Sequence, residues 1–191
     1  MKIAYIVFNG VTWLDFIGVY DAVSRLKSMA YMKDLSWDIC SYTETATDNF
    51  GLKIIPDLVK PSLNIYDTII VPGGHGTRTL IYDTDFLNWI STAKDAEYKM
   101  SVCTGSLLLG AAGFLKEKKA TTNFLEYETL KPYCAEVIRD RLVIDGNVIT
   151  AGAVSSSLDL GLYICEKWAG TKAREAIQER MDYHPQIREQ V

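Results

Sequence analysis

Residues 99–115 read KMSVCTGSLLLGAAGFL, a short apolar run that passes through a cysteine into a stretch of small and apolar residues. The run at Met100–Cys103 is typical of a buried strand, and Thr104–Ala112 carries no charged residue, which is typical of a buried helix. This order predicts a strand that turns directly into a helix at Cys103. A cysteine at such a turn is either a buried structural residue, a common fate of cysteine, or a nucleophile held in a sharp elbow.

Apolar, β-branched runs and helical patterns alternate along the rest of the chain. Further strands are predicted at Lys2–Phe8, Trp37–Thr43, Thr68–Val71, Glu136–Ile138, Arg141–Ile144 and Val148–Thr150. Helices are predicted at Leu14–Met29, Phe86–Ala96, Phe124–Leu130, Ser156–Trp168 and Thr171–Tyr183. Hairpin turns are predicted at Asp145-Gly146-Asn147 and around Asn49–Gly51, the second between Glu44–Thr47 and Leu52–Ile55. This alternation predicts an α/β sandwich around a mostly parallel sheet.

The composition is that of an ordinary globular protein, with 48% hydrophobic and 23% charged residues. A length of 191 residues fits one domain that spans residues 1–191. A formal net charge of −4 and scattered basic residues argue against a nucleic-acid partner. The N-terminal apolar run is too short to span a membrane and lacks a signal-peptide cleavage site. We therefore expect a cytoplasmic protein with no membrane partner.

The cysteines are dispersed and form no CxxC pair. They are Cys40, Cys103, Cys134 and Cys165. Wide spacing argues against a metal site built from cysteines, and a reducing compartment keeps such residues as free thiols. We expect neither a metal nor a cofactor.

Three predicted strand ends carry residues that could do chemistry. The first strand runs into Asn9-Gly10 and then Asp15, Thr68–Val71 runs into Pro72-Gly73-Gly74-His75-Gly76, and the strand at residue 100 runs into Cys103-Thr104-Gly105. Ligands of α/β sheets bind beyond the carboxyl ends of the strands. We therefore expect these segments to converge at one edge of the sheet.

The N–H groups at the start of the helix after Cys103 should point at its sulfur, which favours the thiolate and lowers the thiol pKa. Gly105 keeps side-chain atoms out of the tight turn. In the glycine loop, Gly73 and Gly74 let a substrate approach the backbone closely. The N–H of Gly74, paired with that of Thr104, could form an oxyanion hole.

Asp15 lies in an otherwise apolar segment, Trp13–Gly18, and has two interpretations. It is either an exposed acid in the first turn of a helix, favoured by the helix dipole, or a buried carboxyl group with a raised pKa. A buried, protonated carboxyl group could donate to the cysteine and later shuttle a proton. His75 could reach the site from the glycine loop, whereas Arg78 and His184 are expected at the surface.

The elbow Ser101-Val102-Cys103-Thr104-Gly105-Ser106, the Pro-Gly-Gly loop and the acid after the first strand together resemble the ThiJ/PfpI superfamily. This flavodoxin-like group includes class I glutamine amidotransferase-like proteins. Residues 101–123, the segment Leu14–Gly18 and the hairpin at residues 145–147 are most similar to its isocyanide (isonitrile) hydratase subgroup. The resemblance implies a three-layer α/β/α sandwich, a small-molecule substrate and a homodimer with its site near the subunit interface.

The resemblance also implies roles for particular residues. Cys103 matches the nucleophile, Asp15 the acid beside it, Thr104 the threonine after the cysteine, and Gly74 the loop glycine whose N–H faces the site. In the hydratases the thiolate attacks the isocyanide carbon. Water then converts the thioimidate to an N-substituted formamide.

Two departures from relatives bear on the choice of reaction. Protease-like members usually carry histidine at or near the residue after the cysteine, where this chain has Thr104, so peptidase activity is the weaker hypothesis. Relatives commonly carry histidine at the position of Asn123, and its loss could change the substrate range. The alternatives are an amidase or protease, which needs a base such as His75, and a redox- or electrophile-sensing stress protein, which needs an easily oxidised thiol.

Overall fold

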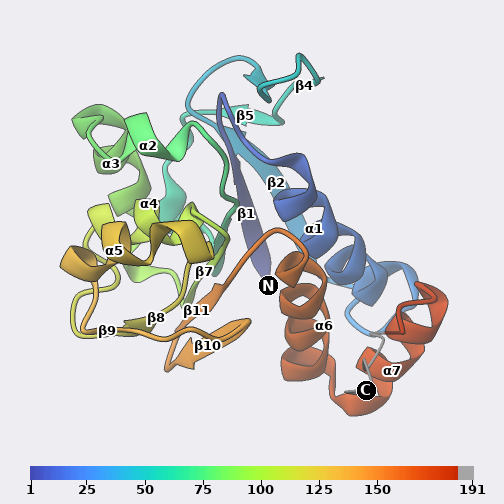
Figure 1. Ribbon diagram of the computed structural model, residues 1–191. Helices are drawn as coiled ribbons and strands as arrows, with labels where there is room; N and C mark the ends of the chain where they lie inside the picture. Colours follow the sequence, from blue (N-terminus) through green and yellow to red (C-terminus); the bar gives the residue numbers. More distant parts are fainter. Residues whose placement is uncertain (185–191) are drawn as a thin grey trace.

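The computed structural model describes residues 1–184 and is built around a seven-stranded sheet (Figure 1). Its strands are β1 (Lys2–Val7), β2 (Ser36–Ser41), β5 (Leu58–Val59), β6 (Thr68–Val71), β7 (Tyr98–Val102), β10 (Leu142–Asp145) and β11 (Val148–Ala151). Their order across the sheet is β10-β11-β7-β6-β1-β2-β5. Neighbouring strands are parallel, except that β10 and β11 form an antiparallel hairpin.

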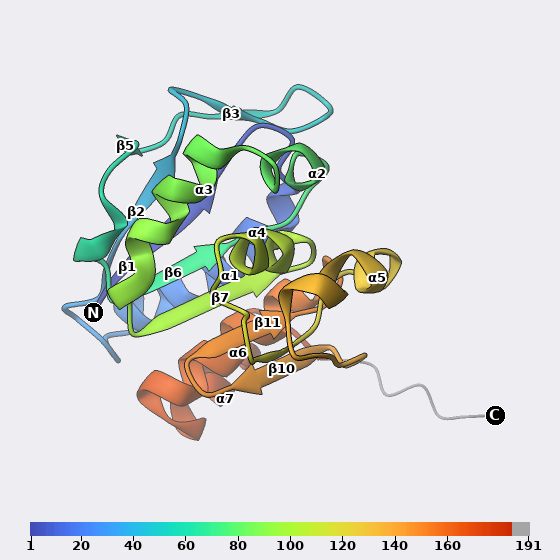
Figure 2. The ribbon, with the colours of Figure 1, turned by 90° about the vertical axis from the view of Figure 1, so that its left-hand side faces the viewer.

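Helices cover both faces of this sheet (Figure 1 and Figure 2). One face carries α1 (Trp13–Ser28), α6 (Ser156–Ala169) and α7 (Thr171–Arg180), and the other carries α2 (Thr77–Leu80), α3 (Thr84–Ser91) and α4 (Gly105–Ala111). A 3₁₀ turn at Phe124–Glu126 leads into α5 (Tyr127–Leu130), beside α4. Other 3₁₀ turns occur at Leu63–Ile65, Thr92–Asp95 and Lys131–Tyr133.

Two small sheets lie outside the central one. The first is an antiparallel pair of β3 (Ala46–Thr47) and β4 (Lys53–Ile54). The second is a parallel pair of β8 (Lys119–Ala120) and β9 (Glu136–Val137). The β3–β4 hairpin is fixed to α1, because the indole N–H of Trp13 donates to the carbonyl of Leu52 at 3.2 Å.

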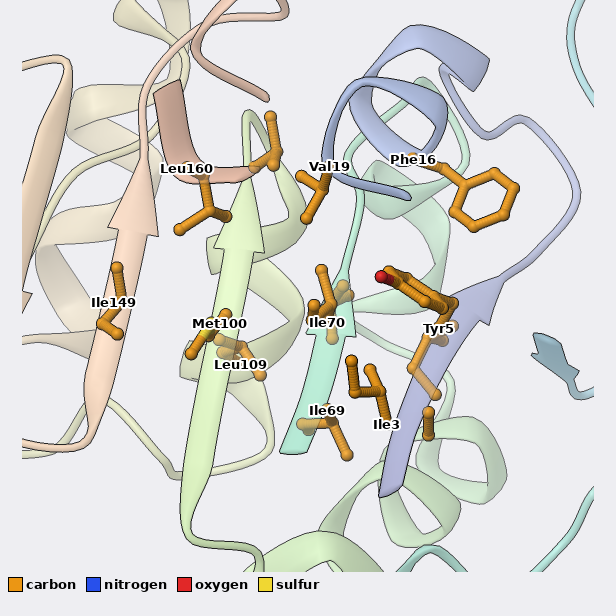
Figure 3. Close-up of a cluster of buried hydrophobic side chains, with 14 of the residues drawn as sticks. Ile3, Tyr5, Phe16, Val19, Ile69, Ile70, Met100, Leu109, Ile149 and Leu160 are labelled. Atoms are coloured by element: carbon orange, nitrogen blue, oxygen red, sulfur yellow. The ribbon is translucent and has the colours of Figure 1, made fainter. Parts of the chain in front are cut away.

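The central strands are buried almost throughout, as expected where helices cover both faces of a parallel sheet. Figure 3 shows apolar side chains of α1 and α6 lying over those of the strands. The helices contribute Phe16, Val19 and Leu160, and the strands contribute Tyr5, Ile70 and Met100. Tyr5 also contacts Phe16 in an edge-to-face arrangement, with ring centroids 5.4 Å apart.

Two glycines allow α1 and α6 to approach each other closely. A Cβ atom on Gly161 would lie 2.7 Å from the Cβ of Ala22 and 3.2 Å from the carbonyl oxygen of Gly18. A Cβ atom on Gly18 would lie 2.2 Å from Oγ of Ser157. This contact sets the position of α1, whose first turn carries Asp15.

The predicted three-layer, mostly parallel sandwich is confirmed. Adjacent positions of β1, β6 and β7 in the sheet bring the three predicted strand ends together. Both predicted hairpins are present, although β3 and β4 are only two residues each. Within residues 1–184, none of the helices combines the length and the apolarity needed to cross a bilayer.

Some predicted elements differ in extent or partner. The strand predicted at Glu136–Ile138 forms β9, but it pairs with β8 in a separate sheet. The helix predicted at Phe86–Ala96 begins earlier, because the side chain of Asp83 accepts from the N–H of Phe86 at 3.0 Å, and it tightens to 3₁₀ geometry after Ser91. The short elements β5, β8 and α2 were not predicted, since two to four residues carry too little periodicity.

We expect Gly161→Ala to destabilise the protein by about 1–3 kcal/mol, because its methyl group overpacks the α1–α6 contact. That cost exceeds the gain of up to about 1 kcal/mol in helix propensity. Urea denaturation measures the change in the free energy of unfolding. Gly152→Ala is the matched control, since a Cβ there would meet no atom closer than 3.5 Å. Equal stability of the two variants would contradict the prediction.

Candidate functional site

Cys103 lies at a strained turn between β7 and α4. Its φ angle is 54°, in the left-handed region that non-glycine residues rarely adopt. Three hydrogen bonds hold this backbone: the Cys103 N–H donates to Ala151 at 3.0 Å, and the Cys103 carbonyl accepts from Ser106 Oγ at 3.2 Å and Thr122 Oγ1 at 3.1 Å. They offset a strain of about 1–3 kcal/mol. The predicted elbow is therefore present, with the cysteine 5% exposed.

Gly105 explains how the helix after the elbow fits against the sheet. A Cβ atom there would lie 2.1 Å from the carbonyl oxygen of Val71 and 2.8 Å from that of Pro72. The first turn of α4 therefore packs directly on the end of β6. Gly105 does not line the pocket described below, and its position is explained by this backbone contact.

Asp15 is fully buried in the first turn of α1, so the interpretation as an exposed acid is wrong. Its Oδ2 accepts from the N–H of Gly73 at 2.9 Å, which ties α1 to the glycine loop. Within residues 1–184, Oδ1 makes no hydrogen bond. The carboxyl group nevertheless lies within interaction range of the Cys103 thiol, since each group shifts the pKa of the other.

Burial raises the pKa of Asp15 to about 7, against the opposing effects of the Gly73 N–H and the Cys103 thiol. The predicted direction of this shift is therefore confirmed. A carboxyl group with a pKa near 7 exchanges a proton readily at neutral pH. That property suits a group that passes protons to and from a neighbouring atom.

The glycine loop packs tightly against the other two strand ends. Thr12 donates its N–H to the carbonyl of Gly73 at 2.9 Å, and Gly76 donates its N–H to the carbonyl of Gly10 at 3.1 Å. A Cβ atom on Gly73 would lie 2.5 Å from the nitrogen of Thr104 and 2.9 Å from Oδ2 of Asp15. Glycine at this position is therefore required by the approach of both neighbours.

The predicted oxyanion hole is not present as expected. The N–H of Gly74 donates to Oγ1 of Thr104 at 3.0 Å, so it is not free to bind a substrate oxygen. Gly74 has a φ of 141°, and a Cβ atom there would lie 2.2 Å from the carbonyl oxygen of Gly10. Thr104 thus joins the glycine loop to the elbow, and its own N–H interacts with the sulfur of Cys103.

The pKa of Cys103 also differs from the prediction. Burial, and next the negative charge of Asp15, raise the pKa of this thiol to about 11. Hydrogen bonds from the Asn123 side chain and from the N–H and hydroxyl of Thr104 favour the thiolate but do not compensate. The start of the helix acts in the predicted direction, but burial of the thiol, together with the charge of Asp15, outweighs it.

A pocket of about 430 Å³, including space open to solvent, leads to the cysteine. Its lining residues come from all three strand ends and from two further segments: Thr12, Gly74, His75, Arg78, Cys103, Thr104, Asn123, Leu125 and Val154. Asp15 and Gly73 are not among these lining residues. Thr12, Leu125 and Val154 were not predicted, because no local pattern shows that their segments fold over the elbow.

The two histidines have different positions. His75 is exposed at the pocket wall, as its place in the glycine loop suggested, and within residues 1–184 it makes no hydrogen bond to Cys103. His184 is exposed near Asp182, as expected. Arg78 is exposed as predicted, yet it also lines the pocket and forms an ion pair with Glu126, next to α5.

The fold and the site define an α/β protein whose cysteine sits in a strand-to-helix elbow beside a buried carboxyl group. The DJ-1/PfpI family matches residues 1–167, and the chain belongs to this family. The chain is 34% identical over 187 residues to the isonitrile hydratase of Pseudomonas putida, an alignment that covers 97% of this chain and 79% of that protein. It is 23% identical over 140 residues to protein DJ-1 homolog A of Arabidopsis thaliana, covering 71% of this chain and 36% of that protein.

Solved structures agree with this assignment. A ThiJ/PfpI family protein from Pseudomonas syringae superposes with a TM-score of 0.87 at 29% identity, covering 98% of this chain and 77% of that one. DJ-1beta of Drosophila melanogaster superposes with a TM-score of 0.81 at 17% identity, covering 96% of this chain and 98% of that one. At 17% identity, the similarity to DJ-1beta shows a shared fold alone.

We expect the free energy of unfolding to fall between pH 4.5 and pH 8 by on the order of 2–4 kcal/mol more in the wild type than in Asp15→Asn. Over this range the folded protein keeps the Asp15 proton up to about pH 7, whereas the unfolded chain has lost it above about pH 4. Raising the pH therefore favours the unfolded state of the wild type, and asparagine removes this effect. Urea denaturation across the pH range measures the free energy of unfolding of the wild type and of the variant. The same dependence on pH in both proteins would contradict the prediction.

Proposed function

We propose that this chain is a small-molecule enzyme that uses Cys103 as a nucleophile and hydrates an isocyanide to an N-substituted formamide. The observation that carries the proposal is the pairing of Cys103 with the buried carboxyl group of Asp15, whose pKa of about 7 suits proton transfer. Similarity to an isonitrile hydratase over 97% of the chain supports the choice of substrate. Thr104 and Gly73 position the pair through their contacts with the glycine loop and the acid.

The first half of the reaction forms a covalent intermediate. As the sulfur of Cys103 attacks the terminal carbon of the isocyanide, the thiol proton passes to the ionised carboxylate of Asp15. The carboxyl group then delivers this proton to the same carbon, which yields a thioimidate, R–N=CH–S–Cys. Because the proton moves during attack, a thiol with a pKa of about 11 at rest is compatible with the step.

The second half consumes one water molecule. Water adds to the thioimidate carbon as Asp15 removes one of its protons. The carboxyl group passes this proton to the nitrogen, which gives the tetrahedral intermediate R–NH–CH(OH)–S–Cys. As this intermediate collapses, the C–S bond breaks, a C=O bond forms, and the hydroxyl proton passes through Asp15 to the sulfur. The products are R–NH–CHO and the regenerated cysteine, so the net reaction adds one water to the isocyanide.

The structure gives less support to the alternative functions. An amidase or protease needs a base that activates the cysteine and protonates an amine, and His75 makes no hydrogen bond to Cys103 among the described residues. A sensor of oxidants needs a thiolate at rest, whereas burial and Asp15 raise the pKa of Cys103. All four cysteines are free thiols, and we propose a reducing compartment such as the cytoplasm.

Incubation with an alkyl isocyanide tests the proposal, with the formamide measured by mass spectrometry. We expect turnover by the wild type, at least 100-fold slower turnover by Asp15→Asn, and none above background by Cys103→Ala. Cys134→Ala is the matched control, because Cys134 is another free thiol outside the pocket. Absence of wild-type turnover, or equal turnover by Cys103→Ala, would overturn the proposal. Selective oxidation of Cys103 by mild peroxide, without turnover, would favour the sensor instead.

We further propose that the chain forms a homodimer through an apolar surface made by α1 and the β3–β4 hairpin. Ile17 and Leu14 are exposed on α1, and Phe50, 96% exposed, and Leu52 are exposed at the hairpin. The Trp13–Leu52 hydrogen bond holds the hairpin against α1, which places these exposed side chains on two adjoining elements. Exposed apolar side chains of this size gathered on one face are typical of a protein interface. A second copy of the chain suits this surface, since the same residues meet across a two-fold axis.

We expect Ile17→Glu to convert the dimer to a monomer, because the interface would then bury an unpaired carboxylate from each copy. Sedimentation equilibrium or light scattering measures the mass. Ile144→Glu is the matched control, since Ile144 on β10 is exposed to a similar extent, 47% against 43% for Ile17. A monomeric wild type, or a dimeric Ile17→Glu variant, would contradict the proposed interface.

A further inference from the structure

Asn123 makes two hydrogen bonds that join the cysteine to the pocket wall. Its Nδ2 lies 3.4 Å from the sulfur of Cys103. Its Oδ1 accepts from the N–H of Leu125 at 3.0 Å and so caps the 3₁₀ turn at Phe124–Glu126. Asn123 is half-buried and lines the same pocket as the cysteine.

The cap fixes which end of the amide faces the sulfur. If the amide of Asn123 were flipped, its NH₂ group would face the N–H of Leu125, and two donors would oppose each other. The observed orientation satisfies that N–H with Oδ1 and leaves Nδ2 pointing at Cys103. Backbone geometry in the pocket wall therefore presents a donor to the sulfur.

Asn123 acts on the sulfur in the opposite direction from Asp15. The carboxylate of Asp15 disfavours a negative charge on Cys103, whereas the amide of Asn123 favours it. An amide has no proton to gain or lose between pH 5 and pH 9, so its contribution does not change with pH. The remaining donors to the sulfur come from Thr104, the next residue in the chain.

We propose that Asn123 is a catalytic residue, which stabilises the thiolate of Cys103 by a hydrogen bond whose orientation is set by the cap on Leu125. The role in turnover rests on the proposed function, in which the thiolate forms during attack on the substrate and again when the C–S bond breaks. The hydrogen bond to the thiolate itself does not depend on any substrate. An experiment can therefore disprove the hydrogen bond to the thiolate and the role in turnover separately.

Asn123→Asp is the sharpest test, because aspartate keeps the cap acceptor and replaces the donor to the sulfur by a carboxylate oxygen. We expect the pKa of Cys103 to rise by about one unit or more, so alkylation of this thiol by iodoacetamide at pH 8 slows about tenfold or more. The rate is followed by mass spectrometry of the peptide that contains Cys103. Isocyanide turnover should fall by at least the same factor.

Asn123→Ser provides a second variant without a new charge, since serine also caps helical turns but is too short to reach the sulfur. It should slow alkylation about threefold or more. Asn147→Asp is the matched control, because it makes the same change at an exposed hairpin turn and should leave alkylation unchanged. Unchanged alkylation rates in both Asn123 variants would overturn the proposal. Slowed alkylation in the Asn123 variants, together with a wild type that does not hydrate isocyanides, would overturn only the proposed function.

Discussion

The left-handed backbone at Cys103 is the constraint on which the rest of the site depends. A cysteine keeps a φ of 54° only where neighbouring segments hold it, and here β11, α4 and the segment after β8 each supply a hydrogen bond. The turn aims the sulfur out of the sheet toward the pocket. It also brings the start of α4 so close to β6 that Gly105 cannot carry a Cβ atom. Elbow, glycine loop and first helix are therefore fixed together.

Burial then controls the chemistry of the pair at this elbow. Burial raises the pKa of both Asp15 and Cys103, and the negative charge of Asp15 further disfavours ionisation of the thiol, whereas the thiol favours ionisation of Asp15. The pair therefore keeps at least one proton at neutral pH, because the thiol stays protonated while Asp15 titrates near pH 7. A site of this kind is unreactive without substrate but can move a proton as soon as the sulfur attacks. In the proposed reaction, the carboxyl group of Asp15 takes the role of the base that a histidine would have.

Much of the architecture could be predicted because its signals are local. The elbow at Cys103, the glycines after Val71 and the apolar strands each follow from a few adjacent residues, and the rule for carboxyl ends of parallel strands brings them together. The direction in which the Cys103 pKa shifts could not be predicted from the sequence. It depends on how deeply the thiol is buried and on how close Asp15 lies in space, although the two residues are 88 positions apart in the chain. The bond from Gly74 to Thr104 was missed for a similar reason, since a side-chain torsion decides it.

The absence of a histidine in hydrogen-bond contact with Cys103, among residues 1–184, changes what the site can respond to. In a cysteine–histidine pair the histidine titrates near pH 6.5, and activity follows that ionisation. Here the groups that contact the sulfur are a carboxyl group, a threonine and the amide of Asn123, and only the carboxyl group titrates near neutral pH. In the proposed reaction, the Asp15–Cys103 pair supplies the proton for the first half, and this pair titrates through Asp15. Asn123 can stabilise the thiolate without adding a second group that titrates near neutral pH. The protonation of Asp15 therefore sets the pH range in which the site can react.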